Sequence, residues 1–148
     1  MRKRYPGITN EQLDRSKHVR EELQELINKV AEENDPAEEA KLLLRLTSPT
    51  HWKGIQFGDR AVLGLAIRQL CYALDATDQG VVIAALVGLQ NLDSAIWLLD
   101  SGDRHRTRVI KKVRKLRIFC NNRDIQTRAM DLFLSENFGV RYAWDAIN

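Results

Sequence analysis

Apolar residues recur along this chain at the spacing of helices, and no stretch alternates as a strand would. The most apolar stretch covers 59–99, which is dense in Ala, Val, Leu and Ile and holds two basic residues, Arg60 and Arg68. Helices that are apolar on most of their circumference lie inside a packed protein. We therefore expect two helices of this stretch, joined near 75–78, to form the core.

The first sixty residues predict a helical hairpin with an acidic character. Apolar residues from Val19 to Val30 alternate spacings of four and three, which indicates an amphipathic helix over 9–33. This narrow apolar seam either packs inward or pairs two chains as a homodimer through helix 9–33. Asp35 followed by Pro36 is typical of a helix start, and the second helix should end near residue 48.

Further helices are expected on the C-terminal side of the core. The pattern predicts helices over 103–121 and 124–137, a short helix that opens at residue 91 or 93, and a short final helix after Gly139. These add up to seven or eight helices and no strand, an all-α fold. Short joints make successive helices antiparallel neighbours, so we expect a compact orthogonal bundle, with a short HEAT-like stack of helical hairpins as the alternative.

The length and composition indicate one soluble domain behind a short arm. The 148 residues are 44% hydrophobic and 29% charged, which is ordinary for a globular protein. We expect residues 1–8 to form a basic flexible arm and 9–148 a single domain. In that domain the acidic hairpin 9–48 would pack on a helical core over 59–148.

The two cysteines and the hydropathy pattern suggest an intracellular, cytoplasmic protein. Cys71 and Cys120 both fall within apolar helical patterns, where a free thiol behaves as a small hydrophobe. A disulfide framework needs more cysteines than these two. No apolar run follows the basic residues at the start of the sequence, so we expect no signal peptide, and we expect no transmembrane segment.

Positive charge is concentrated in one predicted helix. Residues 104–148 hold eleven basic and four acidic side chains, and eight of the fourteen residues in 104–117 are Arg or Lys with no acid among them. On a helical wheel the apolar residues of this segment fall on one side and a basic stripe of about three turns on the other. The predicted contact residues are Arg104, Arg108, Lys111, Lys112, Arg114 and Lys115.

A stripe of like charge opposes its own helix slightly, which suggests an anionic partner. Nucleic-acid backbone, bound without sequence-specific readout, is the preferred partner class. The alternative is a protein-interaction module, inhibitor or adaptor that docks an acidic protein. An anionic membrane fits less well because the apolar side of the helix is needed for the core. Two interpretations need no partner: helix 9–33 could neutralise the stripe within the fold, or the stripe could be an ordinary solvated surface.

The irregular stretch 50–58 is the other place where the sequence suggests a site. Its His51, Trp52 and Lys53 make a possible loop site, and His51 with Lys53 is the one candidate for a general base. The alternative is that Trp52 and its aromatic and aliphatic neighbours plug the end of the bundle. The sequence has no phosphate loop and no zinc or calcium spacing, so we expect no cofactor, no metal and a non-catalytic binding protein.

Overall fold

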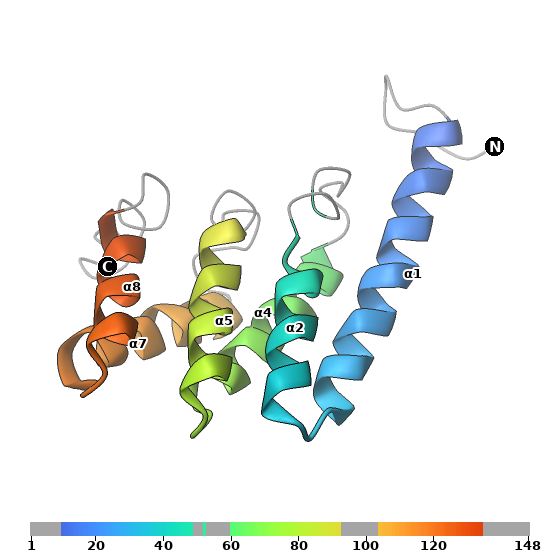
Figure 1. Ribbon diagram of the computed structural model, residues 1–148. Helices are drawn as coiled ribbons and strands as arrows, with labels where there is room; N and C mark the ends of the chain where they lie inside the picture. The colour runs from blue at the N-terminus through green and yellow to red at the C-terminus, as the bar shows by residue number, and fades with distance from the viewer. Residues whose placement is uncertain (1–9, 49–51, 53–59, 93–103, 135–148) are drawn as a thin grey trace.

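The computed structural model describes residues 10–48, 52, 60–92 and 104–134, and every element in these ranges is a helix (Figure 1). The helices are α1 (Asn10–Glu32), α2 (Pro36–Leu46), α4 (Arg60–Leu74), α5 (Gln79–Asn91), α7 (Arg104–Phe119) and α8 (Arg123–Leu134). The all-α prediction is confirmed for these six helices, which form a compact structure. The short helix expected near residues 91–99 and the final helix after Gly139 lie outside the described residues, so the expected total of seven or eight is not confirmed.

The helices are arranged in two rows. Helices α2, α5 and α8 stand side by side and run in the same direction, with α1 beside α2 at one end of the row (Figure 1). Helices α4 and α7 contact each other in the second row, behind the first. The rows are joined where α4 packs on α1 and α5, and where α7 packs on α8. As a result, α5 lies between α2 and α8 and against α4.

The core lies where the sequence predicts it, on α4 and α5. Seven of the thirteen residues of α5 are buried, and α4 contributes fully buried side chains such as Leu63, Ile67 and Leu70. Gly88 of α5 permits a close approach, because an added Cβ would lie 2.9 Å from Thr47 Cγ2 and 3.1 Å from Leu70 Cδ2. Thr47 is fully buried, and its hydroxyl donates to the Leu43 carbonyl at 2.9 Å. The glycine therefore lets α5 pack tightly against both α2 and α4.

The helix starts follow local capping chemistry, with two differences from the prediction. Asp78 caps α5, since its carboxylate accepts a hydrogen bond from the Val81 amide at 3.1 Å. Asp35 has the extended backbone of an N-cap before α2, but its side chain makes no capping hydrogen bond. Helix α8 begins at Arg123 rather than Asp124, because the Asn122 side chain accepts from the Ile125 amide at 3.1 Å.

The apolar seam of α1 packs inward. Leu23, Leu26, Ile27 and Val30 are each at most 5% exposed, and α1 contacts α2 and α4. Pairing of two chains through helix 9–33 stays a prediction, but these four seam residues are already covered within the chain.

Trp52 is buried, as expected if it plugs the end of the bundle. It is 8% exposed, and its indole Nε1 donates to the Leu46 carbonyl at 2.7 Å. This bond satisfies a carbonyl at the C-terminal end of α2 that the helix itself leaves without a partner. Ile55 and Phe57, the other residues expected in the plug, lie outside the described residues.

Candidate functional site

Helix α7 separates an apolar side from a basic side. Val109 and Val113 are at most 1% exposed and pack in the core, and Leu116 lies partly buried against it. This matches the side predicted from the sequence. Ile110, 9% exposed, joins the buried side as well. Because these residues fix the rotation of the helix, its basic side chains must point away from the core.

The predicted basic residues on α7 form one continuous surface, which we call the basic face: Arg108, Lys111, Lys112, Arg114 and Lys115. Four of the five are exposed. Lys112 differs, because its side chain is 25% exposed and forms an ion pair with Asp75, the residue that directly follows α4. Arg104, also predicted as a contact, is the first residue of α7, and its side chain lies outside the described residues.

The edge of the basic face runs along α4. Burial raises the pKa of the Cys71 thiol on α4 to about 11, although the positive charges of Lys112 and Arg108 lower it. Lys112 also reaches Asp75, one turn beyond Cys71. Arg108 and Lys112 are likewise one turn apart on α7. The two helices therefore lie side by side, and Arg108 and Lys112 lie along the segment that runs from Cys71 to Asp75.

Two exposed residues of α4 extend this surface and were not predicted as site residues. Tyr72 is 49% exposed, and Arg68 Nε donates to its hydroxyl at 2.8 Å. The Arg68 guanidinium carbon lies 5.5 Å from the ring centroid, within the range of a cation–π contact. The apolar pattern of 59–99 predicts a buried core and no surface site. The available signal was the i, i+4 pairing of Arg68 with Tyr72 on an otherwise apolar helix.

Two adjoining hollows open where α4 ends beside the second half of α7. The first, about 240 Å³, is lined by Leu74, Asp75, Lys112, Lys115, Leu116 and Cys120. The second, about 220 Å³, shares Leu74, Leu116 and Cys120 with the first and continues toward the start of α8. The first hollow therefore combines apolar walls with two ammonium groups at the edge of the basic face, one of which, that of Lys112, is paired with the Asp75 carboxylate.

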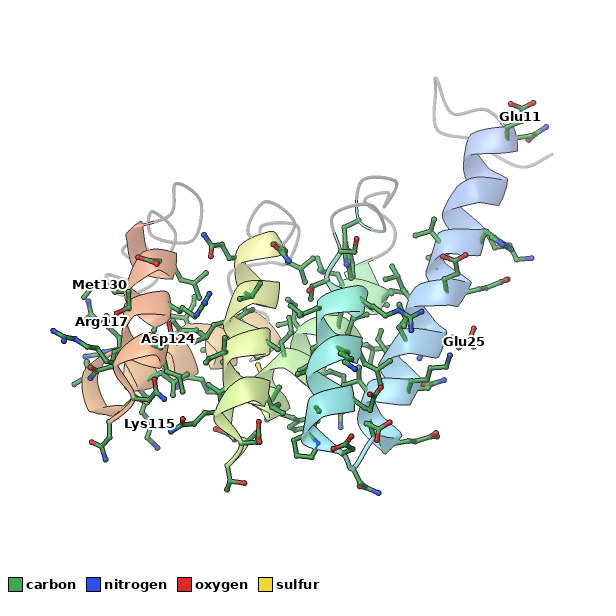
Figure 2. The ribbon with its side chains drawn as sticks, in the orientation of Figure 1. Glu11, Glu25, Lys115, Arg117, Asp124 and Met130 are labelled. Carbon is green, nitrogen blue, oxygen red and sulfur yellow. The ribbon has the colours of Figure 1, made fainter. Side chains whose placement is uncertain are left out.

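The acidic first helix does not cover the basic face. Figure 2 shows Glu11 and Glu25 on α1 at one end of the molecule and Lys115 and Arg117 at the other. Glu25 pairs with Lys29 of its own helix at 3.4 Å, and α1 packs on α2 and α4. The interpretation in which helix 9–33 neutralises the stripe is therefore wrong, because the two helices pack at opposite ends of the rows.

The loop site predicted around Trp52 is only partly described. Trp52 is buried with its indole hydrogen-bonded to α2, and His51 and Lys53 lie outside the described residues. Within the described ranges, no three or more His, Cys, Asp or Glu side chains are grouped so that they could hold a metal ion. Likewise, none of the six described helices combines the length and apolarity needed to cross a membrane.

Comparisons with protein-family models, with curated proteins and with solved structures found no match to this chain. The geometry and charge of the surface itself are therefore the basis for its function.

Proposed function

We propose that this protein is a non-catalytic, cytoplasmic binding protein whose basic face engages the phosphate backbone of a nucleic acid without reading its sequence. One observation supports this above the others. Four basic side chains of one helix are exposed on one surface, no acid lies on that helix, and the acidic helix α1 packs elsewhere. A rigid row of Arg and Lys matches a track of phosphates, and each neutralised phosphate releases counterions.

The arrangement of helices suits such a role. We propose that it is a short HEAT-like stack of three hairpins, α1–α2, α4–α5 and α7–α8, with any further helices falling outside the described residues. The common direction of α2, α5 and α8 and the contact of α4 with α7 support this interpretation (Figure 1). Stacked hairpins present their helices as an extended surface, which fits a long polyanion better than a small molecule.

The test is the affinity of the chain for a fluorescent oligonucleotide of mixed sequence, measured at several salt concentrations. If about four phosphates are neutralised, log K should fall with log salt with a slope of about −3. The variant Arg108→Glu, Lys111→Glu, Lys115→Glu should bind at least tenfold more weakly and with a slope of −1 or shallower, because three phosphate contacts are lost and replaced by repulsion.

A matched control keeps the overall charge equal. Lys17, Lys29 and Lys41 are exposed on α1 and α2, so reversing all three to Glu changes the net charge by the same amount at the other end of the molecule. This control should retain most of the affinity and of the salt slope. Equal losses in the two variants would show that net charge alone governs binding, and the proposed site would be wrong.

The same titration separates the alternative partner. A polyglutamate peptide presents carboxylates rather than phosphates, and the Lys112–Asp75 pair already joins an ammonium of the basic face to a carboxylate. Tighter binding of the peptide than of the oligonucleotide, lost in the Arg108/Lys111/Lys115 variant, would reject the nucleic-acid proposal in favour of an acidic protein partner.

A further inference from the structure

We propose that the strand bound by the basic face is single-stranded, and that Tyr72 of α4 is a platform on which one of its bases stacks. This inference rests on the proposed function and adds the class of nucleic acid to it. Non-specific single-strand binding combines a basic track for the backbone with aromatic rings for the bases. The sequence of α7 supplies the first component, and the fold places the second on the adjacent helix.

The geometry brings Tyr72 to the edge of the basic face. Arg68 and Tyr72 are one turn apart on α4, about 40° from each other around that helix, and Asp75 directly follows the end of α4, three residues after Tyr72. Asp75 pairs with Lys112 of α7, which places the end of α4 next to the basic side chains of α7. One turn separates Tyr72 from Asp75 along the helix, a rise of about 4.5 Å. A backbone that follows α7 can therefore hold a base over α4.

The ring of Tyr72 is presented for stacking rather than packed away. It is 49% exposed, on a helix whose neighbouring apolar residues Cys71 and Ala73 are 2% exposed. Arg68 binds the ring at its hydroxyl end, 2.8 Å from Nε to Oη, which restrains the side chain before any ligand arrives. Arg68 also adds a positive charge beside the ring, where it can contact a phosphate or the edge of a base.

The first hollow fits the same ligand. Leu74 and Leu116 line it together with Lys112, Lys115 and Asp75. A duplex keeps its bases stacked inside and offers only its backbone to a surface of this kind, whereas a single strand can turn a base toward an apolar wall. Aromatic ring, apolar hollow and basic row together favour the single strand.

The experiment compares three probes of about 12 nucleotides by fluorescence anisotropy: a mixed-sequence single strand, the corresponding duplex, and an abasic strand with the same phosphates. The single strand should bind at least fivefold more tightly than the abasic strand. Tyr72→Ala should weaken binding of the single strand about 5- to 100-fold, the effect of losing one stacked base, and leave the abasic strand and the salt slope unchanged.

The control variants separate stacking from folding and from charge. Tyr72→Phe keeps the ring and loses only the hydrogen bond from Arg68, so it should bind the single strand within about threefold of wild type. Circular dichroism should show Tyr72→Ala as helical as wild type, because the residue is exposed.

The outcomes distinguish this inference from the proposed function. Equal binding of all three probes, unaffected by Tyr72→Ala but abolished by reversing Arg108, Lys111 and Lys115, would overturn the stacking platform and leave the backbone proposal standing. Binding that responds neither to salt nor to that charge reversal would overturn both.

Discussion

The buried thiol of Cys71 makes stability depend on pH in a defined direction. Burial raises its pKa to about 11 from an ordinary value near 9, so the folded protein holds this proton more tightly than the unfolded chain does. The contribution to stability is complete below about pH 9 and is lost as the pH rises through 11. The loss from this one group should approach about 2 to 3 kcal/mol.

Urea unfolding at pH 8, 9, 10 and 11 measures this effect. The free energy of unfolding of wild type should fall more steeply than that of Cys71→Ala, because other alkaline titrations are common to both proteins. Cys120→Ala removes the half-buried thiol instead and should keep the steep fall that Cys71 causes. Parallel pH profiles for wild type and Cys71→Ala would contradict the buried thiol.

Single residues also show what the sequence could reveal about the candidate site. Lys111 and Lys115 were predictable as exposed residues, since their positions opposite Val109 and Val113 follow from helical periodicity alone. Tyr72 was not predictable, because its importance depends on α4 lying beside α7. That neighbourhood is a tertiary fact which no periodic pattern within one helix contains.

The N-cap residues of α5 and α2, Asp78 and Asp35, differ in how much they stabilise their helices. Asp78 accepts a hydrogen bond from the Val81 amide, whereas Asp35 makes no capping bond with its side chain. Asp78→Ala should therefore lower the free energy of unfolding by about 1 kcal/mol, and Asp35→Ala by less than about 0.5 kcal/mol. Thermal or urea unfolding at neutral pH measures both, and a larger loss for Asp35→Ala would contradict the observed caps.

The variant Asp78→Asn isolates the capping bond from the charge. Asparagine caps a helix as well as aspartate does, so its stability should match or slightly exceed wild type. Desolvation and the negative charges of Asp78 and Glu33 raise the pKa of Glu39, so the charged form of the Glu39 carboxylate is destabilised in the folded protein. This is the reason for the slight gain in stability. Removing the charge of Asp78 relieves part of that repulsion.

Most helices were predictable as elements, and their ends were predictable where the capping residue was unambiguous. Asp35–Pro36 marks the start of α2 through chemistry contained in a few residues. Thr77 and Asp78 both suited the start of α5, and the structure shows that Asp78 accepts the capping bond from the Val81 amide. The start of α8 was misplaced by one residue because Asn122 and Asp124 are both good caps, and only the folded backbone shows which side chain reaches an amide. Local sequence defines candidates for a helix end, and the packed chain selects among them.

The packing of the helices against one another was harder to predict from the sequence than the individual helices were. The sequence shows an acidic hairpin at one end and a basic helix toward the other, and both neutralisation within the fold and separation were compatible with that pattern. In the structure α1 packs on α2 and α4, while α7 packs on α4 and α8. Burial of the α1 seam against α2 and α4 determines this separation, because apolar contact outweighs the screened attraction between distant surface charges.

The separation of charge leads to a prediction about association. The seam residues of α1 from Leu23 to Val30 are buried within the chain, and its described exposed charges are five Glu against Lys17, Arg20 and Lys29, which leaves this surface with a small net negative charge. Two such surfaces repel at neutral pH, and we expect light scattering after size exclusion to give the mass of one chain at 0.15 M salt. A homodimer through helix 9–33 would contradict this expectation. The affinity of such a dimer should rise with salt concentration, because salt screens the repulsion between the two acidic surfaces. End-to-end contact between the acidic end of one chain and the basic face of another should instead weaken with salt, so the direction of the salt effect identifies which surfaces meet.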